Sequence, residues 1–345
     1  MRICVLHPSY EGASDEDTEL DPPCSPAPYM RHRPDLEFET VDLARRTSVA
    51  QLKELVRGRR YDVFFNLCDG TWEDAESPGL EVVRALEILG VPFTGADSRS
   101  YEPTKEQMKR AAVAAGVPTP AYSFVFGPEQ IEEAAAVLEL PVIVKHFHGC
   151  GSIGLSRESV CYTTEELRGQ AESTIARFGA ALVEEFVAGR EATVLVLENP
   201  LDPRNPLALT PVECVFPAGE EFKHYYLKWW GFEGMSWQAV DGEALAGRLR
   251  ELAARMFVAL DGVSFARCDF RIRQRDGEVL FLEINPNCGV LYPPDAPGSA
   301  DSVLSVDPLG HAGFIEHLID CALRRHQRRQ DSWVAPAVTE RLAVR

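Results

Sequence analysis

The feature that most constrains this chain is a pair of apolar strands joined by a tight turn, FARCDFRIRQRDGEVLFLEINPN at residues 265–287. Each strand carries one acid among its apolar residues, Asp269 in the first strand and Glu283 in the second. A two-residue Asp-Gly turn would place these acids on opposite faces of the hairpin. A three-residue loop with Gly277 in the left-handed region, or an equivalent bulge, instead places Asp269 directly opposite Glu283 and on one face with Asn285.

Two carboxylates and one amide oxygen on one face are ligands that suit a hard cation such as Mg²⁺. The alternative is that Asp269 and Glu283 are ordinary solvated acids, which we disfavour because two like charges in apolar strands destabilise a fold unless a cation binds them. Arg267, on the same face, could neutralise the acids or stabilise negative charge on a reacting carbonyl. Gly289 could bring a backbone N–H close to a substrate, or it could be a plain turn glycine.

The first hundred residues alternate strand and helix signals. This β-α-β order is typical of a parallel sheet with helices on its faces. The segment 11–33, rich in acids and prolines, is predicted to be a loop. Strands are predicted at 2–7, 37–42, 62–67 and 91–93, and helices at 48–57 and 79–89.

The rest of the chain predicts two further units that mix helices and strands. Helices are predicted at 105–115, 129–138, 165–178, 241–260 and 311–324, and strands at 122–126, 142–145, 181–186, 192–198 and 209–215, besides the hairpin. We therefore predict an α/β fold, with an N-terminal Rossmann-like parallel sheet followed by two α+β lobes. The predicted domains are 1–103, 104–188 and 189–330, followed by a tail at 331–345.

Composition excludes several classes of function. The net charge of −18, from 35 basic and 53 acidic residues, argues against nucleic-acid binding, which needs a basic footprint. The nine cysteines contain no CxxC pair, so a zinc cluster or a disulfide framework is not expected and a reducing cytoplasm is. No apolar stretch approaches the length of about 20 residues that a membrane span needs, and the N-terminal apolar run is too short for a signal peptide.

A glycine-rich loop, HFHGCGSIGL at 146–155, follows a predicted buried strand that ends in Lys145. Gly151 and Ser152 would let backbone N–H groups approach phosphate oxygens, although a plain glycine-rich turn fits the pattern as well. Lys105, on the preceding helix, could add a second phosphate contact or be merely solvated. The segment EEFVAGRE at 184–191 could present backbone groups to adenine and an acid to a ribose, or carry surface acids.

Together these pieces resemble the ATP-grasp superfamily and, within it, the D-alanine–D-alanine ligase branch. The resemblance covers nearly the whole chain and depends on the order and spacing of its motifs rather than on any one of them. The motifs are FFNLCDG (64–70), VPFTG (91–95), TKEQMK (104–109), GVPTP (116–120), VKHFHGCGSIGL (144–155), VEEFVAGRE (183–191), ARCDF (266–270) and LEINPNCG (282–289).

The resemblance implies a role for each candidate residue. Lys105 and Lys145 look like the lysines that contact ATP phosphates, and Gly151 with Ser152 like the loop that covers them. Lys228 resembles a lysine that reaches the transferred phosphate. The remaining implied roles are adenine and ribose contacts for Glu184, Phe186, Val187, Phe281 and Glu191, magnesium ligands for Asp269, Glu283 and Asn285, and oxyanion stabilisation for Arg267 and Gly289.

The chain departs from the family pattern at the substrate end. The N-terminal strand runs into HPSYEGASDEDTELD, where Glu11 or a nearby acid would replace the usual glutamate anchor. Asp69 stands where the family has a histidine and would favour a cationic substrate group. Tyr292 adds bulk near the acceptor site, and Ser299 corresponds to a serine that binds the acceptor carboxylate.

The implied reaction is an ATP-dependent ligation of a small-molecule carboxylate to an amine through an acylphosphate, with release of ADP and phosphate. ATP and Mg²⁺ are the implied cofactors, with two metal ions for which Mn²⁺ could substitute. A D-alanine–D-alanine ligase of cell-wall synthesis is the alternative within this class, and a nucleotide-binding regulator without chemistry is the alternative outside it. The resemblance is also compatible with a homodimer.

Overall fold

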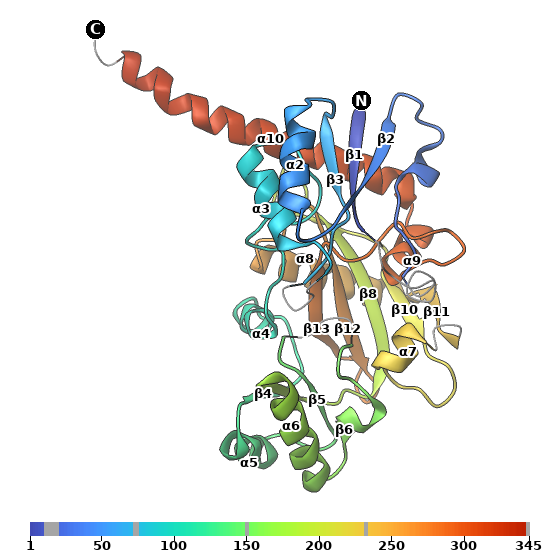
Figure 1. Ribbon diagram of the computed structural model, residues 1–345. Helices are drawn as coiled ribbons and strands as arrows, with labels where there is room; N and C mark the ends of the chain where they lie inside the picture. Colours follow the sequence, from blue (N-terminus) through green and yellow to red (C-terminus); the bar gives the residue numbers. More distant parts are fainter. Residues whose placement is uncertain (10–20, 72–75, 149–151, 231–233, 343–345) are drawn as a thin grey trace.

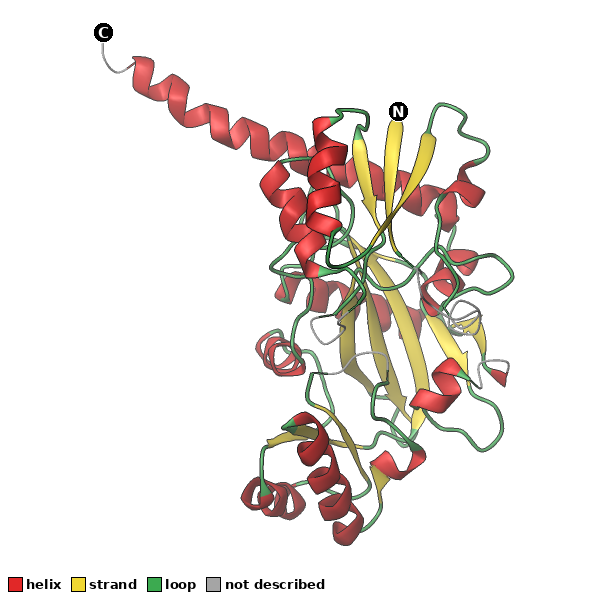
Figure 2. Ribbon diagram, in the orientation of Figure 1, coloured by secondary structure: helices red, strands yellow, loops and turns green. Residues whose placement is uncertain are grey.

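Three β-sheets follow one another along the length of the molecule in the computed structural model (Figure 1). The structure describes residues 1–9, 21–71, 76–148, 152–230 and 234–342. The parallel sheet of the N-terminal residues lies at one end and the sheet of residues 122–185 at the other. A larger antiparallel sheet lies between them. The predicted α/β class is confirmed, and helices flank each sheet (Figure 2).

In the N-terminal sheet, β1 (Arg2–Pro8) lies between β2 (Glu37–Leu43) and β3 (Val63–Asn66), and both pairings are parallel, as predicted. Helices α2 (Ser48–Arg57) and α3 (Leu80–Leu89) pack on one face through a shared apolar core. A single 3₁₀ turn, η1, spans Ala27–Met30. The strand expected at 91–93 is reduced to one bridge between Phe64 and Phe93, so that prediction was wrong.

The other face of this sheet is covered by the C-terminal helices, α9 (Ser299–Val306) and α10 (Gly310–Leu342). Phe65 of the sheet shares one core with Phe314 and Leu318 of α10. The helix then extends beyond the body of the molecule (Figure 1), so the tail expected from 331 is helical as far as Leu342. Pairs four residues apart, such as Gln327 with Asp331 at 2.9 Å, favour continuation of the helix past its expected end.

The central lobe holds a four-stranded antiparallel sheet with two helices on one face. The strand order is β4 (Tyr122–Val125), β7 (Ala181–Glu185), β5 (Val142–His146) and β6 (Val160–Cys161). The lobe also contains α5 (Pro128–Val137), α6 (Thr164–Phe178) and the turn η2 (Arg157–Ser159). Helix α4 (Lys105–Ala114) leads into the lobe and begins with a capping box formed by Thr104 and Gln107.

The large sheet of the C-terminal lobe is built around β8 (Gly189–Leu197), which pairs with β10 (Val212–Val215) and β12 (Phe265–Arg273). The long helix α8 (Glu243–Ala259) packs its apolar stripe against it. The strand expected at 209–215 is shortened to β10, and Pro211, just before it, has no N–H to donate to a ladder. The remaining elements are β9 (Leu207–Ala208), β11 (Ser236–Ala239), β13 (Val279–Pro286) and the short helix α7 (Tyr225–Trp229).

The hairpin β12–β13 pairs Asp269 directly with Glu283, so the predicted alignment of the two acids is confirmed. It does not arise from a three-residue loop, because the turn spans 274–277 and Gly277 adopts a φ of 74°. A bulge leaves Leu282 without a partner on β12 and shifts the register by one residue. The bulge therefore produces the alignment that the turn alone would have prevented.

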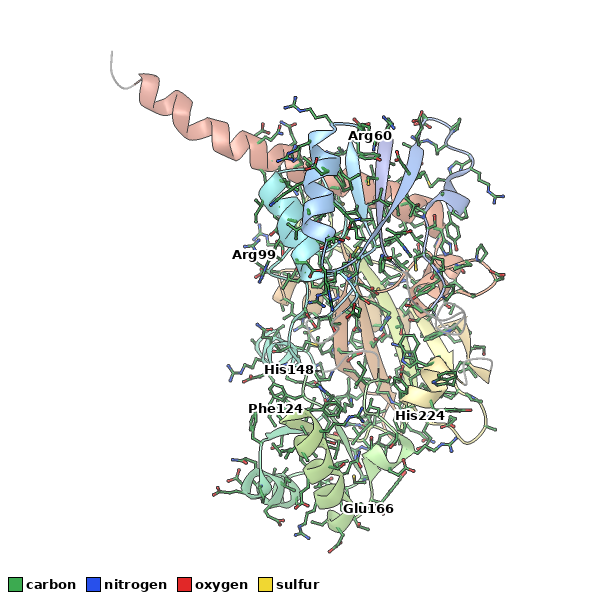
Figure 3. The ribbon with its side chains drawn as sticks, in the orientation of Figure 1. Arg60, Arg99, Phe124, His148, Glu166 and His224 are labelled. Atoms are coloured by element: carbon green, nitrogen blue, oxygen red, sulfur yellow. The ribbon has the colours of Figure 1, made fainter. Side chains whose placement is uncertain are left out.

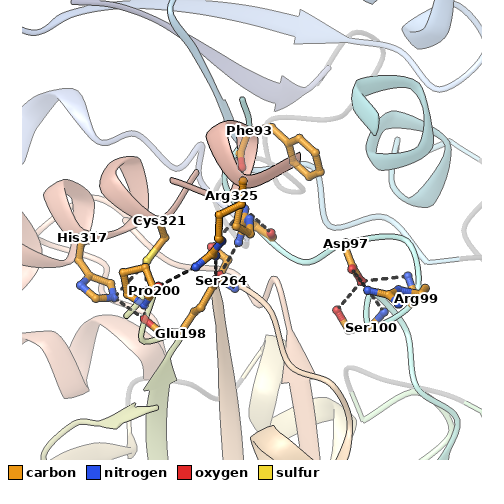
Figure 4. Close-up of polar contacts among 12 residues, drawn as sticks. Phe93, Asp97, Arg99, Ser100, Glu198, Pro200, Ser264, His317, Cys321 and Arg325 are labelled. Carbon is orange, nitrogen blue, oxygen red and sulfur yellow. Dashed lines mark hydrogen bonds and ion pairs between the residues drawn. The ribbon is translucent and has the colours of Figure 1, made fainter. Parts of the chain in front are cut away.

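A polar cluster midway along α10 joins the N-terminal domain to the C-terminal lobe (Figure 4). Arg325 pairs with Glu198 at 2.7 Å and donates to the carbonyl of Phe93, also at 2.7 Å. Ser264 donates its backbone N–H to Glu198 and accepts the N–H of Gly95 at its hydroxyl, both at 3.0 Å. The two parts of the chain are thereby held together beside the apolar core that they share.

Candidate active site

A cleft of about 750 Å³ is lined by residues of all three parts of the chain, a volume typical of small-molecule sites. Glu184 and Phe281, both expected at the site, do not line it, and Glu11 and Gly151 lie outside the described residues. The expected residues that do line it are Asp69, Lys105, Lys145, Ser152, Phe186, Val187, Glu191, Lys228, Arg267, Asp269, Glu283, Asn285, Gly289, Tyr292 and Ser299.

The acidic face of the hairpin lies on one wall of this cleft. Asn285 donates from its amide to Asp269 at 3.1 Å and to Glu283 at 3.4 Å, so the three side chains lie together. Thr193 of β8 donates its hydroxyl to Asp269 at 2.8 Å. Because strand side chains alternate, only one register of β8, β12 and β13 places all four side chains on the same face.

Arg267 binds Asp269 through two of its nitrogens, with Nε 3.1 Å from both carboxylate oxygens and Nη2 3.0 Å from one of them. Burial alone would raise the pKa of Asp269, but the charges of Arg267 and Lys223 outweigh burial and lower that pKa. The arginine therefore keeps the acid ionised in a buried position. Arg267 also lines the cleft.

Glu283 is held by a different cation, the Lys105 ammonium on α4, at 3.7 Å. Burial and the charge of Asp269 would raise the pKa of Glu283, but the charges of Lys105, Lys145 and Arg267 together outweigh them, so the pKa is lowered. Both acids of the hairpin are thus carboxylates at neutral pH. The cationic partner of each acid lines the same cleft.

The hairpin face fits a divalent cation of the hard, oxygen-binding kind. Among the described residues, no group of three or more His, Cys, Asp or Glu side chains could hold a metal ion. The available donors are therefore the carboxylates of Asp269 and Glu283 together with the amide of Asn285, whose oxygen would replace its nitrogen after a simple rotation. Mg²⁺ favours a site that offers few protein oxygens and leaves room for the oxygens of a bound ligand.

The strand ends β5 and β7 form the wall opposite the hairpin. Lys145 of β5 lines the cleft and pairs with Glu184 of β7 at 2.6 Å. Glu184 is 1% exposed and lies behind this wall, and its neighbours Glu185, Phe186 and Val187 line the cleft in its place. The sequence could not separate Glu184 from Glu185, because adjacent strand residues face opposite sides and nothing local says which side is buried.

Two basic residues at this end of the cleft were not expected from the sequence. Lys223 pairs with Glu191 at 2.7 Å and lies 4.5 Å from the ring centre of Trp237. Arg271 donates to the carbonyl of Val187 at 2.9 Å and also pairs with Glu191, at 3.6 Å. The signal for Arg271 was present, since it follows Arg267 and Asp269 in steps of two along β12 and so shares their face.

The segments that carry Ser152 and Lys228 are bound to each other. The Ser152 hydroxyl donates to the Lys223 carbonyl at 2.8 Å, and the Tyr225 N–H donates to the Leu155 carbonyl at 3.0 Å. Figure 3 labels one residue near each segment, His148 shortly after β5 and His224 at the N-cap of α7. These contacts place Lys228 of α7 in the cleft lining together with Ser152.

The far end of the cleft is acidic. Asp69 lines it together with Asp21, the last residue of the segment in which an anchoring acid was expected, and the Tyr292 hydroxyl donates to Asp21 at 2.7 Å. A smaller recess of about 20 Å³ continues from here and is lined by Asp21, Asp69 and Gly289 among others. Gly289 lies so close to Tyr292 that a Cβ there would be 2.6 Å from the tyrosine oxygen, and Ser299 begins α9 beside it.

Phe281 is the one expected nucleotide residue on β13 that the structure places elsewhere. Its side chain is fully buried in the core between the sheet and α8, 5.8 Å from the ring of Phe270. Leu282 lines the cleft instead. The bulge at Leu282 is the reason, because it places two consecutive residues where a regular strand would place one.

Comparison with solved structures identifies the class that this fold and site define. The D-alanine–D-alanine ligase from Bacillus anthracis, solved in complex with ATP, superposes with a TM-score of 0.67 over 95% of this chain and 99% of that chain at 18% identity. The ligase from Coxiella burnetii superposes with a TM-score of 0.68 over 99% of both chains, again at 18% identity. The fold is therefore the ATP-grasp fold of these ligases.

Sequence comparison then assigns the family. A family model described as D-ala D-ala ligase C-terminus matches residues 112–292. The D-alanine–D-alanine ligase of Herminiimonas arsenicoxydans is 31% identical over 256 residues, which cover 72% of this chain and 73% of that one. That of Janthinobacterium sp. is 31% identical over 246 residues, 69% of this chain and 73% of that one. The chain belongs to the D-alanine–D-alanine ligase family and is an ATP-dependent, ADP-forming ligase. No helix among the described residues is long and apolar enough to cross a membrane.

Proposed function

We propose that this chain joins the carboxylate of one amino-acid-like molecule to the amine of another, and that ATP activates the carboxylate as an acylphosphate. The observation that carries the proposal is the composition of the cleft walls. The acids of β12 and β13 face a wall that carries Lys145, and Lys105 lies beside Glu283. A triphosphate needs cations on one side and a metal-binding acidic face on the other, and phosphoryl transfer depends mainly on such placement.

Four residues carry the chemistry in this proposal. Lys105 and Lys145 bind phosphate oxygens and stabilise the charge that spreads over them as the γ-phosphoryl group moves to the substrate carboxylate. The amine then attacks the acylphosphate carbon, its proton leaves, and inorganic phosphate is released. Arg267 and the Gly289 N–H donate to the oxyanion that forms at this carbon, and the loss of one such donor typically costs about 3–4 kcal/mol of transition-state stabilisation.

Asp269, Glu283 and Asn285 would hold Mg²⁺, with Mn²⁺ as a substitute, and a second ion would share the carboxylates. The bound cation would neutralise charge on the phosphates during transfer. At the other end, Phe186 and Val187 provide an apolar surface and backbone groups for adenine. Glu191 would bind the ribose hydroxyls, and the joined segments at Ser152 and Lys228 would exclude water from the acylphosphate.

The acidic end of the cleft supports a substrate with a cationic group. Asp69 and Asp21 both line this end of the cleft, and a cation is attracted to two neighbouring carboxylates. An ammonium or guanidinium on the substrate would supply such a cation. A diamino or guanidino acid therefore fits this end better than an amino acid with an apolar side chain.

A panel of substrates tests the proposal. ADP release is measured with Mg·ATP and pairs of D- and L-amino acids, including diamino acids, guanidino acids and alanine. Amine-dependent ADP formation that is fastest with a basic substrate supports the proposal. Absence of ADP formation that depends on both a carboxylate and an amine would refute it, and size-exclusion chromatography of the same sample measures whether the chain forms the expected homodimer.

The second candidate is a ligase that joins two molecules of D-alanine. The observation that favours it is that the relatives most similar in sequence carry this name, at 31% identity. Turnover with D-alanine as the only amino acid, at a rate equal to that with any basic substrate, would select this candidate.

A further inference from the structure

A cluster of three charged side chains, two of them buried, lies at the cleft wall to which Lys145 belongs. Lys109 of α4 and Glu184 of β7 are each 1% exposed, and they form a close ion pair. The second oxygen of Glu184 binds Lys145 at 2.6 Å. Of the three side chains, Lys145 alone lines the cleft, so Glu184 connects a lysine that the nucleotide can reach with one that it cannot.

Lys109 is held in place from a second direction. Its ammonium donates to the Thr119 hydroxyl at 2.7 Å, and that hydroxyl donates to the Phe281 carbonyl of β13 at 2.9 Å. Lys105 lies one helical turn earlier on the same face of α4, and it reaches Glu283 in the cleft. The helix therefore presents one lysine to the cleft and buries the next.

The balance of charge in this cluster gives Lys109 a role. Two lysines and one acid leave one net positive charge, whereas Glu184 and Lys145 alone would be neutral. Burial would raise the pKa of Glu184, but Lys109 and Lys145 outweigh it and lower that pKa to about 2, so the acid stays ionised. Without Lys109, this carboxylate would cancel the charge that Lys145 offers to a phosphate.

We propose that Lys109 is a positioning residue for nucleotide binding, which acts by binding Glu184 so that Lys145 keeps its positive charge toward the triphosphate. The inference rests on the proposed function, since it takes Lys145 as a phosphate ligand. It adds to that function a lysine that touches neither nucleotide nor substrate and whose effect passes through one buried acid.

A double-mutant cycle tests this role through binding of a non-hydrolysable ATP analogue with Mg²⁺, measured by calorimetry without any amino acid. Lys109→Met should weaken binding by about tenfold or more, because the Lys145 charge is then cancelled. Glu184→Gln added to Lys109→Met should restore most of the affinity, because Lys145 again carries the net charge. Lys109→Arg should bind like the wild type, and Lys53→Met, which changes an exposed lysine on α2, is the matched control.

Three results would overturn the inference alone. The first is that Lys109→Met binds the ATP analogue as tightly as the wild type. The second is that the double variant binds it as weakly as Lys109→Met. The third is that Lys109→Met loses no more affinity for the analogue than Lys53→Met does. If Lys109→Met does not fold, the double variant decides, because it leaves no uncompensated buried charge and should bind like the wild type. A wild-type chain that binds no Mg·ATP analogue would overturn the proposed function together with this inference.

Discussion

Replacement of Arg325 by methionine should lower the free energy of unfolding, because it removes contacts that join the N-terminal domain to the C-terminal lobe. Arg325 of α10 contacts both parts, because it pairs with Glu198 of the lobe and donates to the Phe93 carbonyl of the domain, each at 2.7 Å (Figure 4). The side chains of Arg325 and Glu198 are 12% and 8% exposed. Methionine keeps much of the packing volume while it removes every one of these polar contacts.

The expected loss follows from what remains around Glu198. Removal of one partner from a buried ion pair costs about 3–5 kcal/mol when the other charge is left alone. Here Arg328 still lies 3.3 Å from Glu198, and the Ser264 N–H still donates at 3.0 Å, so the cost should fall at the low end. The lost hydrogen bond to the Phe93 carbonyl adds about 1 kcal/mol. We expect a total decrease of about 3–4 kcal/mol in the free energy of unfolding.

Urea-induced unfolding followed by circular dichroism measures this loss, and Arg328→Met is the matched control. Arg328 pairs with the same carboxylate, but its side chain is 48% exposed, so its removal should cost below about 1 kcal/mol. A difference between the two variants of less than about 1 kcal/mol would refute the reasoning, because it would show that burial at this junction does not strengthen the pair.

Three further results are expected. Asp269→Asn and Glu283→Gln should each lower turnover by about 100-fold or more without unfolding the chain, as measured by ADP release and circular dichroism, and unchanged turnover would remove the hairpin from the chemistry. Asp69→Asn should raise the KM for a basic substrate by about tenfold and leave the KM for ATP unchanged; equal changes in both constants would contradict a substrate role. Glu184 has a folded pKa lowered from 4.5 to about 2, so its contribution of about 3 kcal/mol is present above pH 4.5 and is lost as the pH falls toward 2. The stability gap between the wild type and Glu184→Gln should therefore close over that range, and a gap independent of pH would count against the lowered pKa.

Local patterns predicted much of the fold. The order of strands and helices indicated a parallel N-terminal sheet, and the structure has β1 between two parallel neighbours. The apolar stripe of 241–260 predicted α8 closely, because an amphipathic period is a property of neighbouring residues. The short elements β11 and α7 were missed, since segments of four or five residues carry too little periodic signal.

The candidate site was predictable where motifs gather residues on one strand. Asp269, Asn285 and Arg267 all reached the cleft, because their positions along β12 and β13 determine the face that they share. Glu184 and Phe281 did not, because burial on the far side of a sheet depends on which helix packs there. Asp21 could not be singled out from the other acids near Glu11, since its contact with Tyr292 joins residues far apart in the chain.

The amino-acid sequence by itself determined which chemical groups are available, in what order they occur, and to which family of ATP-dependent ligases the chain belongs. These are properties of residue type and spacing, and folding does not change them. The tertiary structure alone decided how the groups combine. A one-residue bulge at Leu282 sets the acids of the hairpin side by side. Glu184, which was expected to contact adenine, is instead buried and pairs with Lys109 and Lys145. Both outcomes depend on contacts between residues far apart in the chain, which local spacing does not encode.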